Sequence, residues 1–212
     1  MLLDADDCQL VLVDYQTRLM PVIFEGDGVA ANAIRLANMA RIMRVPVWAT
    51  AQAPDKLGPL AADVAAAVAA AGGKTLAKSH FNAVADGLAD WLRPPVQKAA
   101  YRPAPQGNAR SLPKHLQRAA PQEEEAEPSA IVIAGCEAHV CLMQTALSLL
   151  EEEFEVWVVT DACGSRTERN RDAAFDRLAG AGAELVTTEM VAFEWLRSSS
   201  HPAFKQLLAL VK

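Results

Sequence analysis

Three side chains that could together perform nucleophilic chemistry stand at separate points of the sequence: Asp14, Lys78 and Cys141. A thiolate is a strong nucleophile, a carboxylate can take up the thiol proton, and a nearby ammonium group stabilises the resulting negative charge. Each residue alone also has an ordinary structural explanation, because free cysteines are commonly buried, strand-terminal carboxylates often cap turns and most lysines are solvated. The combination points to covalent chemistry only if the fold brings the three together.

The elements that would position these residues are short apolar runs that alternate with longer helical patterns. The runs have the near-continuous hydrophobicity of strands that are buried on both faces. Alternation of this kind, repeated about six times, predicts an α/β protein with three layers (α/β/α) and a six-stranded, mostly parallel sheet of the doubly wound, Rossmann-like type. The predicted strands are residues 8–14, 45–50, 75–78, 130–135, 155–160 and 183–187, and the predicted helices are about 29–43, 60–71, 84–92, 139–152 and 168–181, followed by two short C-terminal helices.

Open α/β sheets bind their ligands at the carboxyl ends of their parallel strands. The residues of this sequence that could take part in catalysis lie at these strand ends. Asp14 ends the first strand, Lys78 ends the third, and the turn after the fourth carries Glu137, His139 and Cys141. Neighbouring strands lie about 4.8 Å apart, so Asp14 and Cys141 are neighbours if the fourth strand lies beside the first. The first turn of a helix, where we expect Cys141, favours the thiolate through its dipole and free N–H groups.

The composition of the 212 residues fits one ordinary globular domain spanning 1–212, with 51% hydrophobic and 22% charged residues. The formal net charge of −6 argues against nucleic acid as a partner, because nucleic-acid binding needs a basic surface. No stretch reaches the roughly 20 apolar residues of a membrane span, and the first residues are acidic where a secretory signal would be basic. Four cysteines form no disulfide framework in a chain of this length, so we expect reduced thiols and a cytoplasmic location.

Residues 93–129 interrupt the alternation of strands and helices and read as a proline-rich insertion in the domain. Seven prolines in this stretch exclude a long regular helix, although a short helix is conceivable around residues 114–118. A solvated excursion is the favoured interpretation, and the alternatives are a lid, an oligomer contact or a partly disordered segment.

Three motifs in the expected order resemble those of the isochorismatase-like cysteine hydrolases: Val11–Gln16, which contains Asp14; Lys78–Asn82; and Gly135–Cys141. Three motifs together are far more specific than any one of them. The tail, Asp161–Arg166 and then Glu189–Lys205, looks closest to the subgroup called isochorismatase-domain-containing proteins. The resemblance covers nearly the whole chain except residues 93–129, and it implies the isochorismatase-like version of the α/β fold.

The resemblance implies a metal-independent hydrolase in which Asp14 takes the thiol proton, Lys78 holds the charges in place and Cys141 attacks a carbonyl carbon of a small molecule. Water would then release a covalent, thioester-type intermediate of an amide, ester or related substrate. The resemblance also implies a cis peptide bond between Cys136 and Glu137, with the N–H groups of Glu137 and Cys141 directed at the developing oxyanion. The side chains expected to line the substrate pocket are Gln16, Gln52, Phe81 and His139.

Two other functions stay open at this point. A metal-dependent, nicotinamidase-like amidase would carry an Asp-x-His motif after the second strand, but this chain has Trp48–Gln52 there, so we expect neither a metal nor another cofactor. A catalytically silent binding or assembly protein with the same fold is the second alternative. The resemblance further implies a homo-oligomer, either a dimer or a larger assembly.

Overall fold

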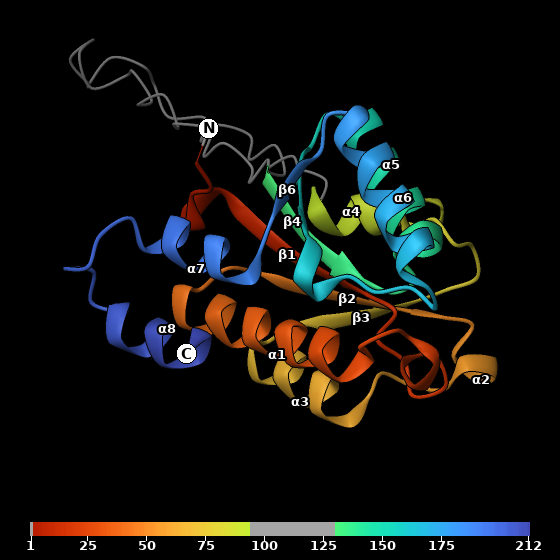
Figure 1. The fold of residues 1–212 in the computed structure, drawn as a ribbon, viewed down its shortest axis with the longest axis horizontal. Helices are drawn as coiled ribbons and strands as arrows, with labels where there is room; N and C mark the ends of the chain where they lie inside the picture. The colour runs from red at the N-terminus through yellow and green to blue at the C-terminus, as the bar shows by residue number, and fades with distance from the viewer. Residues whose placement is uncertain (1, 94–129) are drawn as a thin grey trace, which may run out of the picture.

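A six-stranded parallel sheet forms the centre of the protein, whose computed structural model describes residues 2–93 and 130–212 (Figure 1). The strand order is β3-β2-β1-β4-β5-β6, and every neighbouring pair is parallel. All six residues of both β1 and β4 are buried, as expected for strands covered on both faces. The strands are β1 (Cys8–Val13), β2 (Val47–Gln52), β3 (Lys74–Lys78), β4 (Ala130–Gly135), β5 (Glu155–Val159) and β6 (Glu184–Val186).

Helices cover both faces of this sheet, which gives the three layers visible in Figure 1. One layer contains α1, α3, α7 and α8, which pack on one another, and the other contains α4, α5 and α6. Thr167 and Thr187 begin α6 and α7 because each side-chain oxygen accepts a hydrogen bond from the first helical turn. The helices are α1 (Gly26–Met43), α2 (Pro54–Leu57), α3 (Ala62–Ala70), α4 (Leu88–Leu92), α5 (Met143–Glu151), α6 (Glu168–Gly180), α7 (Thr188–Leu196) and α8 (Phe204–Val211).

Short helical turns connect several of these elements and differ from the sequence-based expectation. The predicted helix at residues 84–92 is divided, because Gly87, with a φ of 92°, ends a 3-10 turn before α4 begins. The predicted start of the helix after β4 is instead a π-helical turn, η5 (Ala138–Leu142), which continues into α5. The 3-10 turns are η1 (Ala5–Asp7), η2 (Met20–Val22), η3 (Ala83–Asp86) and η6 (Thr160–Ala162).

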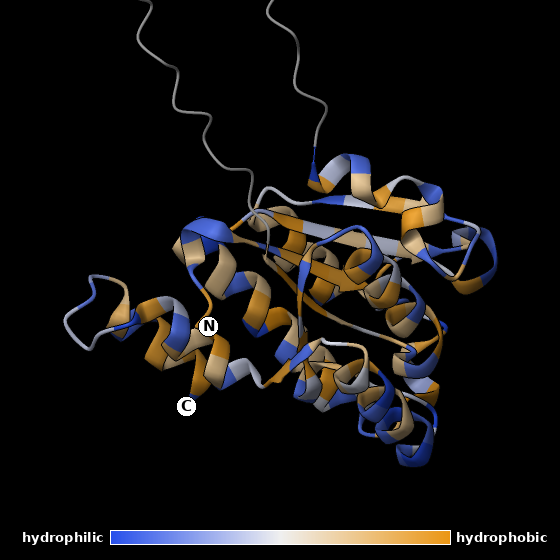
Figure 2. Cartoon of the chain, turned by 90° about the horizontal axis from the view of Figure 1, so that it is seen from above, coloured by the Kyte–Doolittle hydropathy of each residue, from blue (hydrophilic) through white to orange (hydrophobic). Residues whose placement is uncertain are grey.

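The hydrophobic core lies between the sheet and its two helical layers. In Figure 2 the hydrophobic residues gather on the central strands and on the sides of the helices that face them. Side chains such as Leu12, Ile133 and Leu36 are fully buried there. The predicted α/β fold with a six-stranded, doubly wound sheet is confirmed, and the sheet is parallel throughout.

The prediction of a proline-rich insertion with a short helix falls almost entirely on residues 94–129, which lie outside the described part of the chain. That the domain spans residues 1–212 likewise remains a prediction. Within the described residues, no helix is both long enough and apolar enough to cross a membrane.

Because several thiols are buried, we expect the folded protein to lose stability at alkaline pH. Burial raises the pKa of Cys8 to about 11 and that of Cys163 to about 12, and it also raises the pKa of Cys136. Between about pH 9 and these values the folded chain binds more protons than the unfolded chain, so stability is complete below about pH 9 and falls as the pH rises. Each thiol that stays protonated only in the folded chain lowers the free energy of unfolding by about 1 kcal/mol for every pH unit above about pH 9.

We expect the urea midpoint to fall between about pH 8.5 and pH 10.5, as measured by circular dichroism. The Cys163→Ser variant, which lacks one titrating thiol, should show a shallower fall over the same range. A midpoint independent of pH over this range would contradict the assignment of these thiols as protonated in the folded state.

Candidate active site

The candidate active site lies where the chain order of the sheet reverses. From β1 the chain continues to β2 on one side, whereas β4 occupies the other side, and such a switch point leaves a crevice beyond the strand ends. The register pairs Val13 with both Thr50 and Gly135, and it pairs Gln52 with Lys78. The last residues of four adjacent strands therefore meet at one edge of the sheet.

Asp14 is held rigidly at the end of β1. Its backbone is in the left-handed region, with a φ of 56°, which is uncommon for a residue other than glycine and costs on the order of 1 kcal/mol. The Asp14 N–H donates to the Thr50 carbonyl at 3.1 Å, and the Thr50 hydroxyl donates to Asp14 Oδ1 at 2.7 Å. Sequence analysis missed Thr50, because nothing in an apolar strand indicates which of its polar residues faces a neighbouring carboxylate.

Lys78 forms an ion pair with Asp14 whose Nζ···Oδ2 distance is 2.7 Å, and neither side chain is exposed to solvent. The ammonium group also donates to Gln52 Oε1 at 2.8 Å and to the carbonyls of His80 and Phe81 at 3.3 and 3.2 Å. Buried charges are tolerated only when they are paired and hydrogen-bonded, and both conditions hold here. Asp14 Oδ2 takes part in this ion pair but in no well-aligned hydrogen bond within the described residues.

Cys141 lies in the π-helical turn η5, and its thiol interacts with both Asp14 and Lys78. Burial is the largest influence on this thiol and raises its pKa to about 12; the Asp14 carboxylate raises the pKa as well, and Lys78 lowers it. The expectation that a helix N-terminus would favour the thiolate is therefore wrong for the resting protein. The physical reason is that the thiol is only 6% exposed and stands beside a carboxylate.

The turn that leads to Cys141 has an unusual backbone. The Cys136–Glu137 peptide bond is cis, and the Glu137 carboxylate accepts hydrogen bonds from both the N–H and the Nε–H of Arg166, each at 3.0 Å. Gly135 must lack a side chain, because a Cβ atom there would overlap the Val13 carbonyl oxygen. Because β4 approaches β1 closely, the turn that contains Cys141 lies next to the end of β1, where Asp14 is located.

The four residues expected to line the pocket have different surroundings. The Gln16 amide bonds to both the N–H and the carbonyl of Gln52, and the Gln52 amide bonds to Lys78 and to the Ser79 carbonyl, so these two amides support the ion pair. His139 shares a hydrogen bond of 3.0 Å with the Ser165 hydroxyl.

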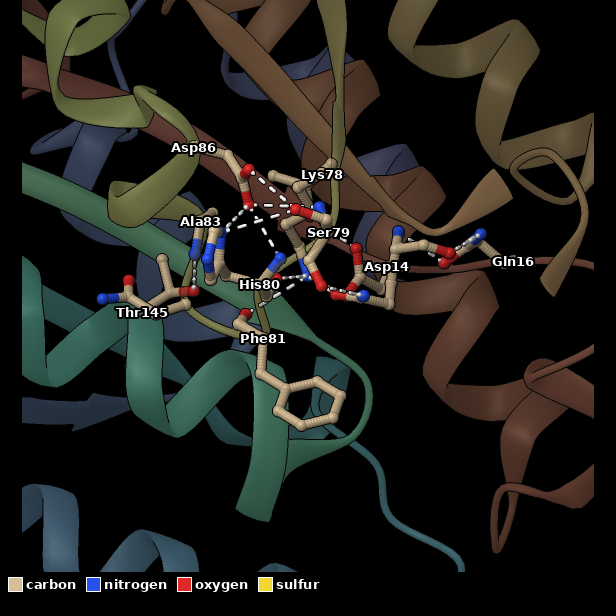
Figure 3. A network of polar contacts seen from close by, with 12 residues as sticks. Asp14, Gln16, Lys78, Ser79, His80, Phe81, Ala83, Asp86 and Thr145 are labelled. Atoms are coloured by element: carbon tan, nitrogen blue, oxygen red, sulfur yellow. Dashed lines mark hydrogen bonds and ion pairs between the residues drawn. The ribbon is translucent and has the colours of Figure 1, made fainter. Parts of the chain in front are cut away.

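Phe81 contacts the site through its backbone carbonyl. Its side chain is 53% exposed, and the ring points away from the ion pair in Figure 3. That Gln16, Gln52, Phe81 and His139 touch a substrate remains a prediction.

Two cavities lie away from this site. Cavities of about 700 and 550 Å³ open at the amino edge of the sheet, and their walls include none of Asp14, Lys78 and Cys141. Within residues 2–93 and 130–212, no group of three or more His, Cys, Asp or Glu side chains is placed to hold a metal ion.

The fold and the site define a doubly wound α/β protein with a buried carboxylate, ammonium and thiol at its switch point. A model of the isochorismatase domain matches residues 117–190. Isochorismatase domain-containing protein 2 of Bos taurus is 31% identical over 205 residues, covering 96% of this chain and 82% of that protein, and the Danio rerio protein of the same name is 30% identical over 202 residues, covering 95% and 85%. The chain belongs to the isochorismatase family.

Solved structures agree with this assignment. The MAR1 ribonuclease of Caenorhabditis elegans has a TM-score of 0.80 and 25% identity, with 100% of this chain and 92% of that chain covered. YcaC of Pseudomonas aeruginosa, solved with a covalent acrylamide, has a TM-score of 0.76 and 26% identity over 99% and 91% of the two chains. YcaC of Escherichia coli, described as an octameric hydrolase of unknown specificity, has a TM-score of 0.73 and 26% identity over 99% and 95%. The chain thus has the fold of isochorismatase-family hydrolases.

The electrostatics of the site predict that Asp14→Asn lowers the pKa of the Cys141 thiol. This substitution removes a negative charge that raises the pKa and leaves the Lys78 ammonium, which lowers it. We expect the pH profile of Cys141 alkylation by iodoacetamide, quantified by peptide mass spectrometry, to shift to lower pH in this variant. Cys8 is the internal control, because its charge interactions are with Asp7 and Asp4 rather than Asp14. A profile that stays in place or shifts to higher pH would show that the carboxylate does not raise the pKa of the thiol.

Proposed function

We propose that this protein is a metal-independent cysteine hydrolase that cleaves an amide, ester or related carbonyl bond of a small molecule. The observation that carries the proposal is the fully buried Asp14–Lys78 ion pair, at 2.7 Å, whose two charges act on the pKa of the Cys141 thiol. A thiol that only fills space in a core has no need of two buried charges beside it, because burying charge is expensive.

The high pKa of Cys141 determines the first chemical step. A free thiolate is scarce near neutral pH when the thiol pKa is about 12, so the proton must leave as the sulfur attacks. Asp14 Oδ2 takes up this proton, and the Cys141 Sγ–C bond forms while the carbonyl electron pair moves to oxygen. Once Asp14 is neutral, the charge that opposed the thiolate is gone and Lys78 stabilises the developing negative charge.

The same carboxyl group completes the cycle. The tetrahedral intermediate collapses, the bond from carbon to the amine or alkoxide breaks, and Asp14 returns its proton to the leaving group. A water molecule then gives a proton to Asp14 and attacks the thioester carbon, the carbon–Sγ bond breaks, and Asp14 returns this proton to Sγ so that Cys141 departs as the thiol. The Lys78 ammonium keeps its charge throughout, so the enzyme returns to its starting state.

Backbone N–H groups of Glu137 and Cys141 are the proposed oxyanion donors. Within the described residues the Glu137 N–H donates to no backbone carbonyl, which leaves it free for a ligand. Donors of this type contribute roughly 3–4 kcal/mol each in comparable enzymes.

The relatives support this chemistry in general terms. Acrylamide is an electrophile that reacts with thiols, and the Pseudomonas aeruginosa relative carries it covalently. The hydrolase description and the octamer of the Escherichia coli relative support a hydrolase that assembles as a homo-oligomer. The ribonuclease name of the Caenorhabditis elegans relative belongs to that protein, and a net charge of −6 here favours small molecules over RNA. All four cysteines are free, which fits the cytoplasmic location that we propose.

We expect Cys141→Ala to abolish turnover while the protein stays folded, because the thiol is the only group proposed to bond to substrate. The measurement is a panel of small amides and esters, with RNA included, assayed beside the urea midpoint of each variant. Cys163→Ser, which changes another buried thiol that takes no part in the proposed chemistry, is the matched control. Normal turnover by Cys141→Ala would eliminate the covalent mechanism.

Acrylamide should label Cys141 faster than Cys8, Cys136 and Cys163 near neutral pH. The reason is that Asp14 can accept the proton of this thiol alone, and the other three are even less exposed. Peptide mass spectrometry over a time course gives the four rates. Equal rates at all four thiols would favour a catalytically silent protein.

A further inference from the structure

The segment that follows Lys78, residues 79–86, is folded around a single carboxylate, that of Asp86. Asp86 Oδ2 accepts hydrogen bonds from the Ser79 N–H at 3.2 Å and the His80 N–H at 2.9 Å, and it lies 3.2 Å from His80 Nδ1. Asp86 Oδ1 accepts from the Ser79 hydroxyl at 3.3 Å. Figure 3 shows these contacts converging on Asp86 directly beside Lys78. We call residues 79–86 the lysine loop.

The lysine loop holds the Lys78 ammonium with its carbonyl groups. Asp86 fixes the N–H side of Ser79 and His80, and the carbonyls of His80 and Phe81 accept hydrogen bonds from Lys78 Nζ. A peptide segment has little freedom once several of its amides are bound. The position of these two carbonyls, and with it the position of the ammonium group, therefore depends on Asp86.

The other end of the lysine loop is fastened to the helix that follows Cys141. The Asn82 side-chain amide donates to the Ser148 hydroxyl at 2.9 Å, and the Ala83 N–H donates to the Thr145 hydroxyl at 3.0 Å. Thr145 and Ser148 are on α5, which continues directly from the turn η5 that contains Cys141. The loop thus connects the ammonium group to the element that carries the thiol.

Asp86 is ionised under ordinary conditions. Burial alone would raise the pKa of its carboxyl group, but the hydrogen bonds and charge of His80 and the hydrogen bond from the Ser79 N–H outweigh this and lower the pKa. Hydrogen bonds to a charged acceptor are stronger than those to a neutral one, so the carboxylate is a firm anchor for the loop.

We propose that Asp86 is a positioning residue of the active site, which fixes the lysine loop so that the Lys78 ammonium stays paired with Asp14 and near enough to act on the Cys141 thiol. The proposal rests on the hydrolase function proposed above and assigns Asp86 no contact with substrate. It explains why the carboxylate binds two successive backbone N–H groups in the segment that immediately follows the active-site lysine.

The test is the rate at which acrylamide labels Cys141 in Asp86→Ala. Without the Asp86 carboxylate, the carbonyls of the lysine loop no longer hold the Lys78 ammonium, and Lys78 moves away from the thiol. The pKa of Cys141 then rises, because Lys78 is the group that lowers it. We expect labelling at about pH 9 to fall about tenfold, which corresponds to one pKa unit. The whole pH profile should shift to higher pH, which a general loss of stability would not cause.

Two further variants separate positioning from charge and from folding. Asp86→Asn keeps an oxygen that can accept from the Ser79 and His80 N–H groups, so it should restore most of the labelling rate. Asp90→Ala removes an equal charge from an exposed position four residues later on α4, and it should label like the wild type. The urea midpoint of each variant reports its folding.

The outcomes distinguish this inference from the proposed function. If Cys141 of the wild type reacts no faster than the other thiols, the result contradicts both the proposed hydrolase function and the positioning role of Asp86. A reactive wild-type Cys141 whose pH profile is unchanged in Asp86→Ala leaves the hydrolase intact and overturns the role of Asp86. A profile shifted equally by Asp90→Ala would assign the effect to net charge and overturn it too.

Discussion

Two opposite charges buried side by side, on Asp14 and Lys78, impose the strongest constraint on this structure. Removing a carboxylate and an ammonium group from water is costly unless they pair closely and their remaining hydrogen-bonding capacity is used. Thr50 and Gln52 satisfy part of that requirement from β2, and the carbonyls after β3 satisfy the rest. Removing either charge alone would leave the other buried without a partner, so the pair and its surroundings must be kept as a unit.

The thiol of Cys141 is best understood from this pair. Near Asp14 and Lys78 it experiences one charge that opposes its ionisation and one that favours it, and burial keeps it protonated. Moving the proton from sulfur to the carboxylate relocates the negative charge without changing the net charge of the three groups. A dry site favours such an internal transfer over the release of a proton to solvent. This is why a thiol with a pKa of about 12 is compatible with nucleophilic catalysis.

Much of this arrangement was predictable from the sequence, because it follows from periodicity and chain order. Continuous apolar runs such as Leu10–Val13 identified the buried strands, and the rule for carboxyl ends of parallel strands assembled Asp14, Lys78 and Cys141 at one edge. The π-helical form of η5 was not predictable, since its residues fit an α-helical pattern equally well. The high thiol pKa was missed for a related reason: it depends on burial and on the distance to Asp14, which spacing along the chain does not encode.

The hydrogen bonds of Asp86 show where sequence reasoning ends and why the site needs the whole fold. An acidic residue eight positions after Lys78 has no distinctive spacing, and only the 3-10 turn η3 directs its carboxylate back to the N–H groups of the lysine loop. The same turn places Asn82 and Ala83 against α5. Three strand ends and one helix are thus joined by polar contacts rather than by apolar packing alone. Polar contacts of this kind have strict geometry, so they fix the positions of the reacting groups more tightly than hydrophobic side chains of similar volume could.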